Sequence, residues 1–167
     1  RIKLGTTVIV LPYRNPIQVA RLGANLDQLS GGRFIFGVGV GAIQSEFDTL
    51  GIPFNKRGAM TDEYLRAMKV LWTHSPASFD GQFVTFTDVH SEPQPVQKPH
   101  PPIWIAVTDV PRTLERAVEL GDGAAILNRP HDVLKRDLDT LRQKLVQGGR
   151  DPDNFAFQFS VYLGGEY

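Results

Sequence analysis

The chain has 167 residues, no cysteine, and 18 basic against 18 acidic side chains, so its formal net charge is zero. This length suffices for one domain with a sizeable core, while the balanced charge and the missing thiols exclude electrostatic recognition of nucleic acid, disulfide frameworks and thiolate chemistry. No apolar run could span a bilayer and no signal peptide is visible, so we expect a cytoplasmic protein without a membrane partner.

The N-terminal part of the chain predicts a strand, a helix and a second strand. The β-branched run 2–11 is typical of a strand, and Asn15-Pro16 is typical of a helix start with Asn15 as its cap. We expect the helix to end at Gly31 and the two strands to be parallel, because the crossover is short. Its buried face should hold four residues spaced three or four apart: Val19, Leu22, Leu26 and Leu29.

Glycine recurs at every second position of the second strand, at Gly37, Gly39 and Gly41. Side chains alternate across a strand, so these three glycines should share one face, opposite a bulky apolar face. A strand face without side chains indicates that something large approaches it closely. Two interpretations remain open: a crowded sheet, or a flat ligand lying at the end of the strand.

Residues 42–102 interrupt the alternation of strands and helices. We expect a short helix at residues 46–48, a hairpin turn at Asp80-Gly81, and an extended connector where prolines gather between residues 93 and 102. A longer helix should span residues 58–72. Its inward residues are predicted to be Tyr64, Leu65, Met68, Leu71 and Trp72.

The C-terminal part predicts strands at 103–107, at 123–127 and from Phe155 to Leu163, with helices at 111–120 and 132–147. Thr108 or Asp109 can cap the first of these helices. The predicted inner faces are Leu114, Ala117, Val118 and Leu120 in the first helix, and Leu134, Leu138, Leu141 and Leu145 in the second. Repeated β–α units predict an α/β fold with a parallel sheet. Five strands can form an open doubly wound sheet but cannot close an eight-stranded barrel, so this pattern alone favours the open sheet.

A set of short segments along nearly the whole chain resembles the luciferase-like monooxygenase family, in particular its coenzyme F420-dependent branch. No single segment is specific, but their order is the family's order. The segments are residues 4–12 (LGTTVIVLP), 15–16 (NP), 26–34 (LDQLSGGRF), 37–41 (GVGVG), 46–47 (EF), 57–58 (RG), 62–65 (DEYL), 93–97 (PQPVQ), 101–105 (PPIWI), 120–123 (LGDG) and 149–152 (GRDP).

The resemblance implies a partial TIM (β/α)8 barrel instead of an open sheet. Its strands resemble the third to the seventh of the family, and the hairpin at Asp80-Gly81 falls in the family's insertion. We therefore expect residues 1–167 to form a single, incomplete luciferase-like barrel domain with an insertion at about 42–100. Because the sequence begins at Arg1 with a strand, we also expect it to be cut from a longer protein.

The resemblance also implies a flavin or deazaflavin ring at the barrel mouth, near Thr7, Val8, Gly39 and Gly41. Family members often have a bulge with a non-proline cis peptide in the first strand seen here, and the matching bond is Thr7–Val8. The alternative is that Thr7 and Val8 form a plain inward strand pair.

A second cofactor-binding segment implied by the resemblance is Val107, Thr108, Asp109 and Val110, where the N-terminus of a helix can hold the cofactor phosphate. The family commonly has two glycines at this turn, whereas this chain has Val107 and Thr108. Asp109 as a helix cap is the alternative. After Gly123 the family usually has Trp, and this chain has Ala124.

Other residues offer weaker candidates. Residues 37–42 also fit a dinucleotide fingerprint, but the acidic residues about twenty positions on, Asp62 and Glu63, fall in a predicted helix. We interpret Asp122 as a turn residue and Arg57 as a solvated charge. The four histidines have no metal-ligand spacing, so we expect no metal site.

The resemblance implies a flavin- or deazaflavin-dependent oxidoreductase or monooxygenase that acts on a small organic substrate with coenzyme F420 or FMN. No catalytic side chain is assigned. The alternative is a non-catalytic barrel fragment or scaffold that has lost cofactor binding. Family members are often homodimers, so a homodimer is the expected assembly.

Overall fold

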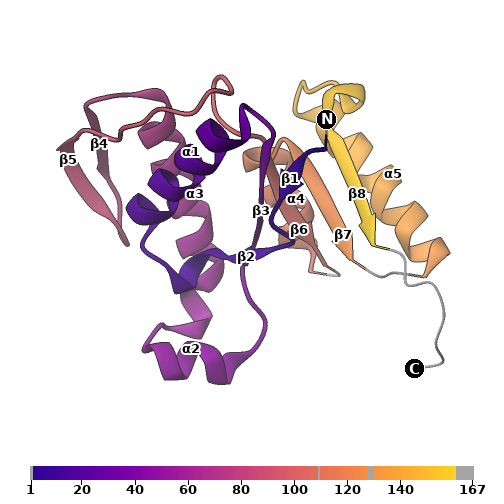
Figure 1. Cartoon of the computed structure of the whole chain (residues 1–167). Helices are drawn as coiled ribbons and strands as arrows, with labels where there is room; N and C mark the ends of the chain where they lie inside the picture. The colour runs from indigo at the N-terminus through magenta and orange to yellow at the C-terminus, as the bar shows by residue number, and fades with distance from the viewer. Residues whose placement is uncertain (1, 109, 128–129, 161–167) are drawn as a thin grey trace. The chain divides into compact units, whose positions relative to one another are not determined.

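The structure, a computed structural model, describes residues 2–108, 110–127 and 130–160 (Figure 1). The chain forms two compact units, Arg1–Pro102 and Ile103–Tyr167. Strands and helices alternate within both, as the sequence predicts. None of the helices in the described ranges has the length and hydropathy that a membrane span requires.

The first unit contains a small parallel sheet whose first strand is interrupted. β1 (Leu4–Gly5) and β2 (Ile9–Val10) both pair with β3 (Phe34–Gly39). Gly5 stands beside Ile35, and Ile9 stands beside Val38, so three residues of one chain segment lie opposite two of the other. The extra residue makes a β-bulge at Thr6–Val8, where the sequence pattern predicts one continuous strand.

Helix α1 (Pro16–Ser30) begins and ends as the sequence predicts. The Asn15 side chain accepts hydrogen bonds from the backbone N–H groups of Ile17 and Gln18, and Gly31 closes the helix with φ 64°. Its predicted buried face is wrong, because only Val19 of the four residues is buried. Leu22, Leu26 and Leu29 are 61%, 47% and 85% exposed.

Small residues make the buried face of α1 because Trp72 of α3 (Arg57–Thr73) lies against it. The Trp72 indole donates a hydrogen bond of 2.8 Å to the Ala20 carbonyl, and a Cβ on Gly23 would lie 3.1 Å from its ring. Bulky leucines therefore do not fit there. The prediction for α3 itself is confirmed, since its five expected core residues are all buried.

The hairpin β4 (Ala77–Asp80) and β5 (Thr85–Val89) is confirmed, with a longer turn than Asp80-Gly81 alone predicts. The carboxylate of Glu63 on α3 accepts hydrogen bonds from the backbone N–H groups of Gln82, Phe83 and Val84, at 2.9, 2.6 and 2.9 Å. A side chain from a neighbouring helix therefore fixes the turn, which local turn chemistry does not reveal.

The proline-rich connector lies along α1 through side chains that bond to backbone. Asp27 is fully buried and accepts hydrogen bonds from the backbone N–H and the side-chain amide of Gln97, at 2.8 and 2.7 Å. The same Gln97 amide donates to the Phe34 carbonyl. These bonds satisfy the buried carboxylate and join α1, β3 and the connector.

The second unit consists of the parallel strands β6 (Ile103–Val107), β7 (Gly123–Leu127) and β8 (Ala156–Ser160), with α4 (Pro111–Leu120) and α5 (His131–Gln147) packed together (Figure 1). The expected inner residues of both helices are buried or half-buried. Asp122 is a turn residue, as predicted, and its carboxylate accepts the Ile103 N–H at 2.9 Å. Val161 and Leu163 of the predicted last strand lie outside the described residues.

Three short helices complete the first unit. The 3-10 helix η1 (Leu11–Tyr13) follows β2 directly, and α2 (Gln44–Leu50) agrees with the short helix predicted around residues 46–48. A second 3-10 helix, η2 (Phe54–Lys56), leads into α3, and a third, η3 (Pro152–Asn154), precedes β8 in the other unit. Together, η1 and α2 carry the side chains around the candidate site.

Candidate functional site

The bulge at Thr6–Val8 is fastened to β3 at Gly37. The Thr6 hydroxyl donates to the Gly37 carbonyl at 2.7 Å and accepts from the Gly37 N–H at 2.9 Å. The Thr6 carbonyl oxygen occupies the position of the missing side chain, so a Cβ on Gly37 would collide with it. The group that approaches Gly37 closely is therefore the backbone of the bulge, which agrees with the crowded-sheet interpretation at this glycine.

The peptide bond Thr7–Val8 is cis, as the family resemblance implies. The three glycines do not share one strand face, because β3 ends at Gly39 and Gly41 lies beyond it with φ 82°. A Cβ on Gly41 would lie 2.8 Å from both Phe47 and Val10. Gly39 pairs with Val10 in the parallel register. The role of Thr7, Val8, Gly39 and Gly41 in cofactor binding stays a prediction.

An open cleft of about 440 Å³ lies along the bulge at the carboxyl end of the interrupted strand. Its wall contains the cis peptide and one formally charged side chain, that of Arg14, whose guanidinium also donates to the Val10 carbonyl at 3.2 Å. The full lining is Thr6, Thr7, Val8, Ile9, Val10, Tyr13 and Arg14. Backbone, small side chains and one cation therefore make a wall suited to a flat, anionic molecule.

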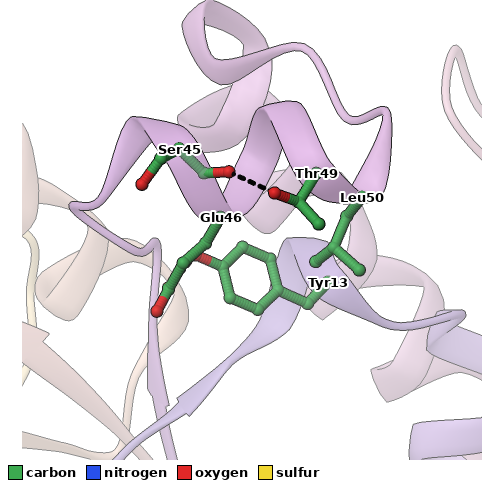
Figure 2. A pocket seen from close by; sticks show the side chains of 5 residues that line it. All are labelled: Tyr13, Ser45, Glu46, Thr49 and Leu50. Carbon is green, nitrogen blue, oxygen red and sulfur yellow. Dashed lines mark hydrogen bonds between the residues drawn. The ribbon is translucent and has the colours of Figure 1, made fainter.

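A second open pocket, of about 390 Å³, lies between η1 and α2 and shares Tyr13 with the cleft (Figure 2). Its other lining residues come from α2: Ser45, Glu46, Thr49 and Leu50. The Tyr13 hydroxyl donates a hydrogen bond of 2.6 Å to Glu46 Oε2. The Tyr13 ring packs edge-on against the buried Phe47 ring, with 4.8 Å between the ring centroids. These contacts hold Tyr13 at a position where it lines both spaces.

Partial burial and the hydrogen bond and negative charge of Glu46 together raise the pKa of Tyr13 from 10 to about 12. The phenol thus stays protonated and keeps its donor role throughout the neutral range. Sequence reasoning missed Tyr13 and Glu46, which lie 33 positions apart. The signal that could have indicated Tyr13 is its place just after a barrel strand, where such enzymes carry functional side chains.

The turn before α4 holds the second predicted cofactor segment. Two of its backbone N–H groups already donate to hydroxyls, that of Thr108 to Thr113 at 3.0 Å and that of Val110 to Thr108 at 3.3 Å. The N-cap residue of α4 is Val110, and no side chain makes a capping hydrogen bond at this end of the helix. The predicted capping by Thr108 is therefore wrong. Asp109 lies outside the described residues. The role of Val107–Val110 in phosphate binding stays a prediction.

Other candidates have structural roles. The prediction that Arg57 is a solvated charge is wrong, because its guanidinium lies 3.7 Å above the Phe54 ring and donates to the carbonyls of Gly41 and Phe54. Asp62 and Glu63 belong to α3, so the strand context of a dinucleotide fingerprint is missing. Among the described residues, no three acidic or histidine side chains gather as metal ligands.

Comparisons with known proteins agree with this geometry. The chain is 36% identical over 152 residues to the uncharacterized protein Rv0953c of Mycobacterium tuberculosis, a match that covers 90% of this chain and 53% of the relative. It is also 36% identical to the oxygenase component of the flavin-dependent trigonelline monooxygenase of Acinetobacter baylyi, over 72% of this chain and 33% of the relative. The FMNH2-dependent dimethylsulfone monooxygenase of Pseudomonas putida is 36% identical over 61% of this chain and 29% of the relative.

Two solved structures show the same fold. The monooxygenase RslO1 from Streptomyces bottropensis has a TM-score of 0.84 and 28% identity, covering 91% of this chain and 47% of that chain. An F420-dependent secondary alcohol dehydrogenase in complex with an F420-acetone adduct also has a TM-score of 0.84, at 23% identity, covering 95% of this chain and 49% of that chain. These likenesses confirm the predicted partial TIM barrel.

The chain spans about half the length, or less, of the relatives it matches. The sequence profile described as luciferase-like monooxygenase matches residues 1–163, nearly the whole chain. A relative with an assigned activity is the FMNH2-dependent dimethylsulfone monooxygenase, and the F420-dependent alcohol dehydrogenase shares the fold. On this evidence, the chain belongs to the luciferase-like monooxygenase family.

Proposed function

We propose that this chain carries the cofactor-binding part of an oxidoreductase or monooxygenase that uses FMN or coenzyme F420 on a small organic substrate. The observation that carries the proposal is the cleft along Thr6–Val10, at the carboxyl end of a parallel strand. Enzymes with this barrel fold work at that end of their strands.

The residues of the cleft fit such a cofactor. Its volume of about 440 Å³ is in the range of small-molecule sites, and Thr7 and Val8 offer a wall of backbone and short side chains to a planar ring. Both candidate cofactors are anionic through their phosphate groups. The guanidinium of Arg14 supplies the complementary charge. Phosphate binding by Val107–Val110 of the second unit stays a separate proposal.

When bound, the cofactor supplies hydride transfer or the activation of oxygen. The residues of this chain orient it: the Thr6–Gly37 hydrogen bonds fix the bulge, and the Tyr13 side chain forms part of the cleft lining. The alternative, a scaffold that has lost its cofactor, is less well supported, since relatives over most of the chain include oxygenases.

The test is titration of the chain with FMN and, separately, with F420, followed by the change in cofactor fluorescence. Thr7 lines the cleft and is exposed, so Thr7→Trp should fill the cleft without disturbing the core. Thr87→Trp, on the exposed part of β5, is the matched control.

We expect saturable binding of one cofactor, an affinity at least tenfold weaker in Thr7→Trp, and unchanged binding in Thr87→Trp. Failure of both cofactors to bind, or equal losses in the two variants, would overturn the proposal. Comparing the two titrations also identifies which cofactor the cleft accepts.

A further inference from the structure

The pocket between η1 and α2 presents hydrogen-bond acceptors to its contents. Glu46 is the one residue of its lining with a formal charge, and its Oε2 accepts a hydrogen bond from the Tyr13 hydroxyl. Within the described part of the chain, Glu46 Oε1 accepts no hydrogen bond. Figure 2 shows Glu46 and Tyr13 side by side below α2.

The Thr49 hydroxyl also offers a hydrogen-bond acceptor to the pocket. The Thr49 hydroxyl donates its proton to the Ser45 carbonyl at 2.8 Å, so its oxygen lone pairs are left for an incoming donor (Figure 2). Leu50, 52% exposed, supplies an apolar surface beside these oxygens. A carboxylate, a hydroxyl oxygen and an aliphatic side chain together suit a molecule with an N–H donor and a small apolar body.

The charges around the pocket favour a cation. The pocket lining carries the acidic side chain of Glu46 and no basic side chain, whereas the basic side chain of Arg14 lines the neighbouring cleft. Because Tyr13 lines both spaces, an anionic cofactor beside Arg14 and a cationic molecule beside Glu46 would occupy adjoining sites.

We infer that the pocket formed by Tyr13, Ser45, Glu46, Thr49 and Leu50 is a substrate-selecting site for small organic amines in their protonated form. Glu46 accepts the N–H groups, and Leu50 contacts the apolar part of the molecule. This inference rests on the proposed function, because a substrate site is meaningful only beside the cofactor cleft. Tyr13 is a positioning residue that holds one oxygen of Glu46 and leaves the other for the ligand.

The experiment measures the dissociation constants of three probes of equal size and different charge: benzylammonium, benzyl alcohol and benzoate. Calorimetry or ligand-detected NMR on the chain gives each value without any cofactor. The variant Glu46→Gln keeps the shape and removes the charge. Asp48→Asn, an exposed carboxylate on the same helix outside the pocket lining, is the matched control.

We expect benzylammonium to bind at least fivefold more tightly than benzyl alcohol, and benzoate to bind most weakly. Glu46→Gln should lower benzylammonium affinity about threefold to tenfold, in keeping with the loss of one charged hydrogen bond at an open site, while Asp48→Asn leaves it unchanged. Tyr13→Phe should keep the preference, because both carboxylate oxygens then face the ligand.

Equal affinities for benzylammonium and benzyl alcohol would overturn the inference, and so would equal losses in the Glu46 and Asp48 variants. Circular dichroism of each variant establishes that it is folded. If a cofactor binds and the amine preference is missing, this inference fails alone. If the preference is present and neither FMN nor F420 binds, the pocket binds amines, but its role as a substrate site is overturned together with the proposed function.

Discussion

At the scale of single residues, the glycine at position 37 correctly predicts that another group approaches the strand closely, but the sequence does not identify that group. The recurrence of glycine predicts a close approach, and the structure brings the Thr6 carbonyl to that position. The cis bond at Thr7–Val8 followed from family resemblance and not from residue chemistry. Tyr13 and Glu46 could not be paired from sequence, because their contact depends on how the two short helices η1 and α2 pack.

Gly37→Ala should destabilise the chain by about 2 kcal/mol, because the added Cβ overlaps the Thr6 backbone, which cannot rotate away. Gly5→Ala is the control. Its Cβ meets Ile35 at the ordinary distances of 3.5 and 3.6 Å, so the cost should stay within about 0.5 kcal/mol. Urea unfolding of both variants measures the difference in stability. Equal midpoints would contradict the close contact between the Thr6 backbone and Gly37.

The phenol of Tyr13 should ionise only near pH 12, because partial burial and Glu46 favour its protonated form. Its pKa is raised above the value of 10 expected for the unfolded chain, so its contribution to stability is complete below pH 10. That contribution is lost as pH rises towards 12. Phenolate absorbance, compared between the parent chain and Tyr13→Phe, isolates this titration.

Glu46→Gln removes the hydrogen-bonded carboxylate and should move the Tyr13 titration back towards pH 10. The shift should be partial, since burial, the largest cause, remains. A Tyr13 titration that does not respond to Glu46→Gln would argue against the contact in Figure 2.

At the scale of elements, helices α1 and α3 show where periodicity succeeds and where it fails. Both have apolar residues spaced three and four apart, and in α3 that stripe is the buried one. In α1 the leucine stripe is exposed, and the stripe with Ala20 and Gly23 is buried against Trp72. Periodicity identifies the helix, while the bulk of its neighbour decides which face turns inward.

The hairpin turn should depend on Glu63, although that residue is about twenty positions away in the sequence. Glu63→Ala removes the acceptor of three backbone N–H groups and should cost about 1–2 kcal/mol. Hydrogen exchange at residues 82–84 should accelerate in this variant and stay unchanged in Asp48→Ala. Unchanged protection of those amides would show that the turn is stable without the Glu63 carboxylate.

At the scale of the whole molecule, the α/β class and the order of its elements could be predicted from pattern alone. The choice of a partial barrel over an open sheet could not, because both solutions use the same β–α units and differ only in closure. The ordered family segments made that choice, and the solved relatives confirm it.

The exposed stripe Leu22, Leu26 and Leu29 on α1 should make the chain associate with itself as concentration rises. Replacing all three by glutamine should lower the mean mass in analytical ultracentrifugation and change the unfolding free energy by less than about 1 kcal/mol. The same substitutions at Leu114, Leu120 and Leu141, which are buried, should instead unfold the chain. Self-association that survives the α1 substitutions would place the homodimer contact, which we propose, on another surface.

The bulge between β1 and β2 is attached to β3 through one hydroxyl and through peptide groups. Peptide groups are common to every amino acid, so evolution can replace Thr7, Val8 or Ile9 and leave that attachment in place. Thr6 and Gly37 are constrained as a pair, whereas the cleft-lining positions between them and η1 are free to diverge. Members of the family can therefore vary the lining of this cleft while inheriting the same attachment of the bulge to β3.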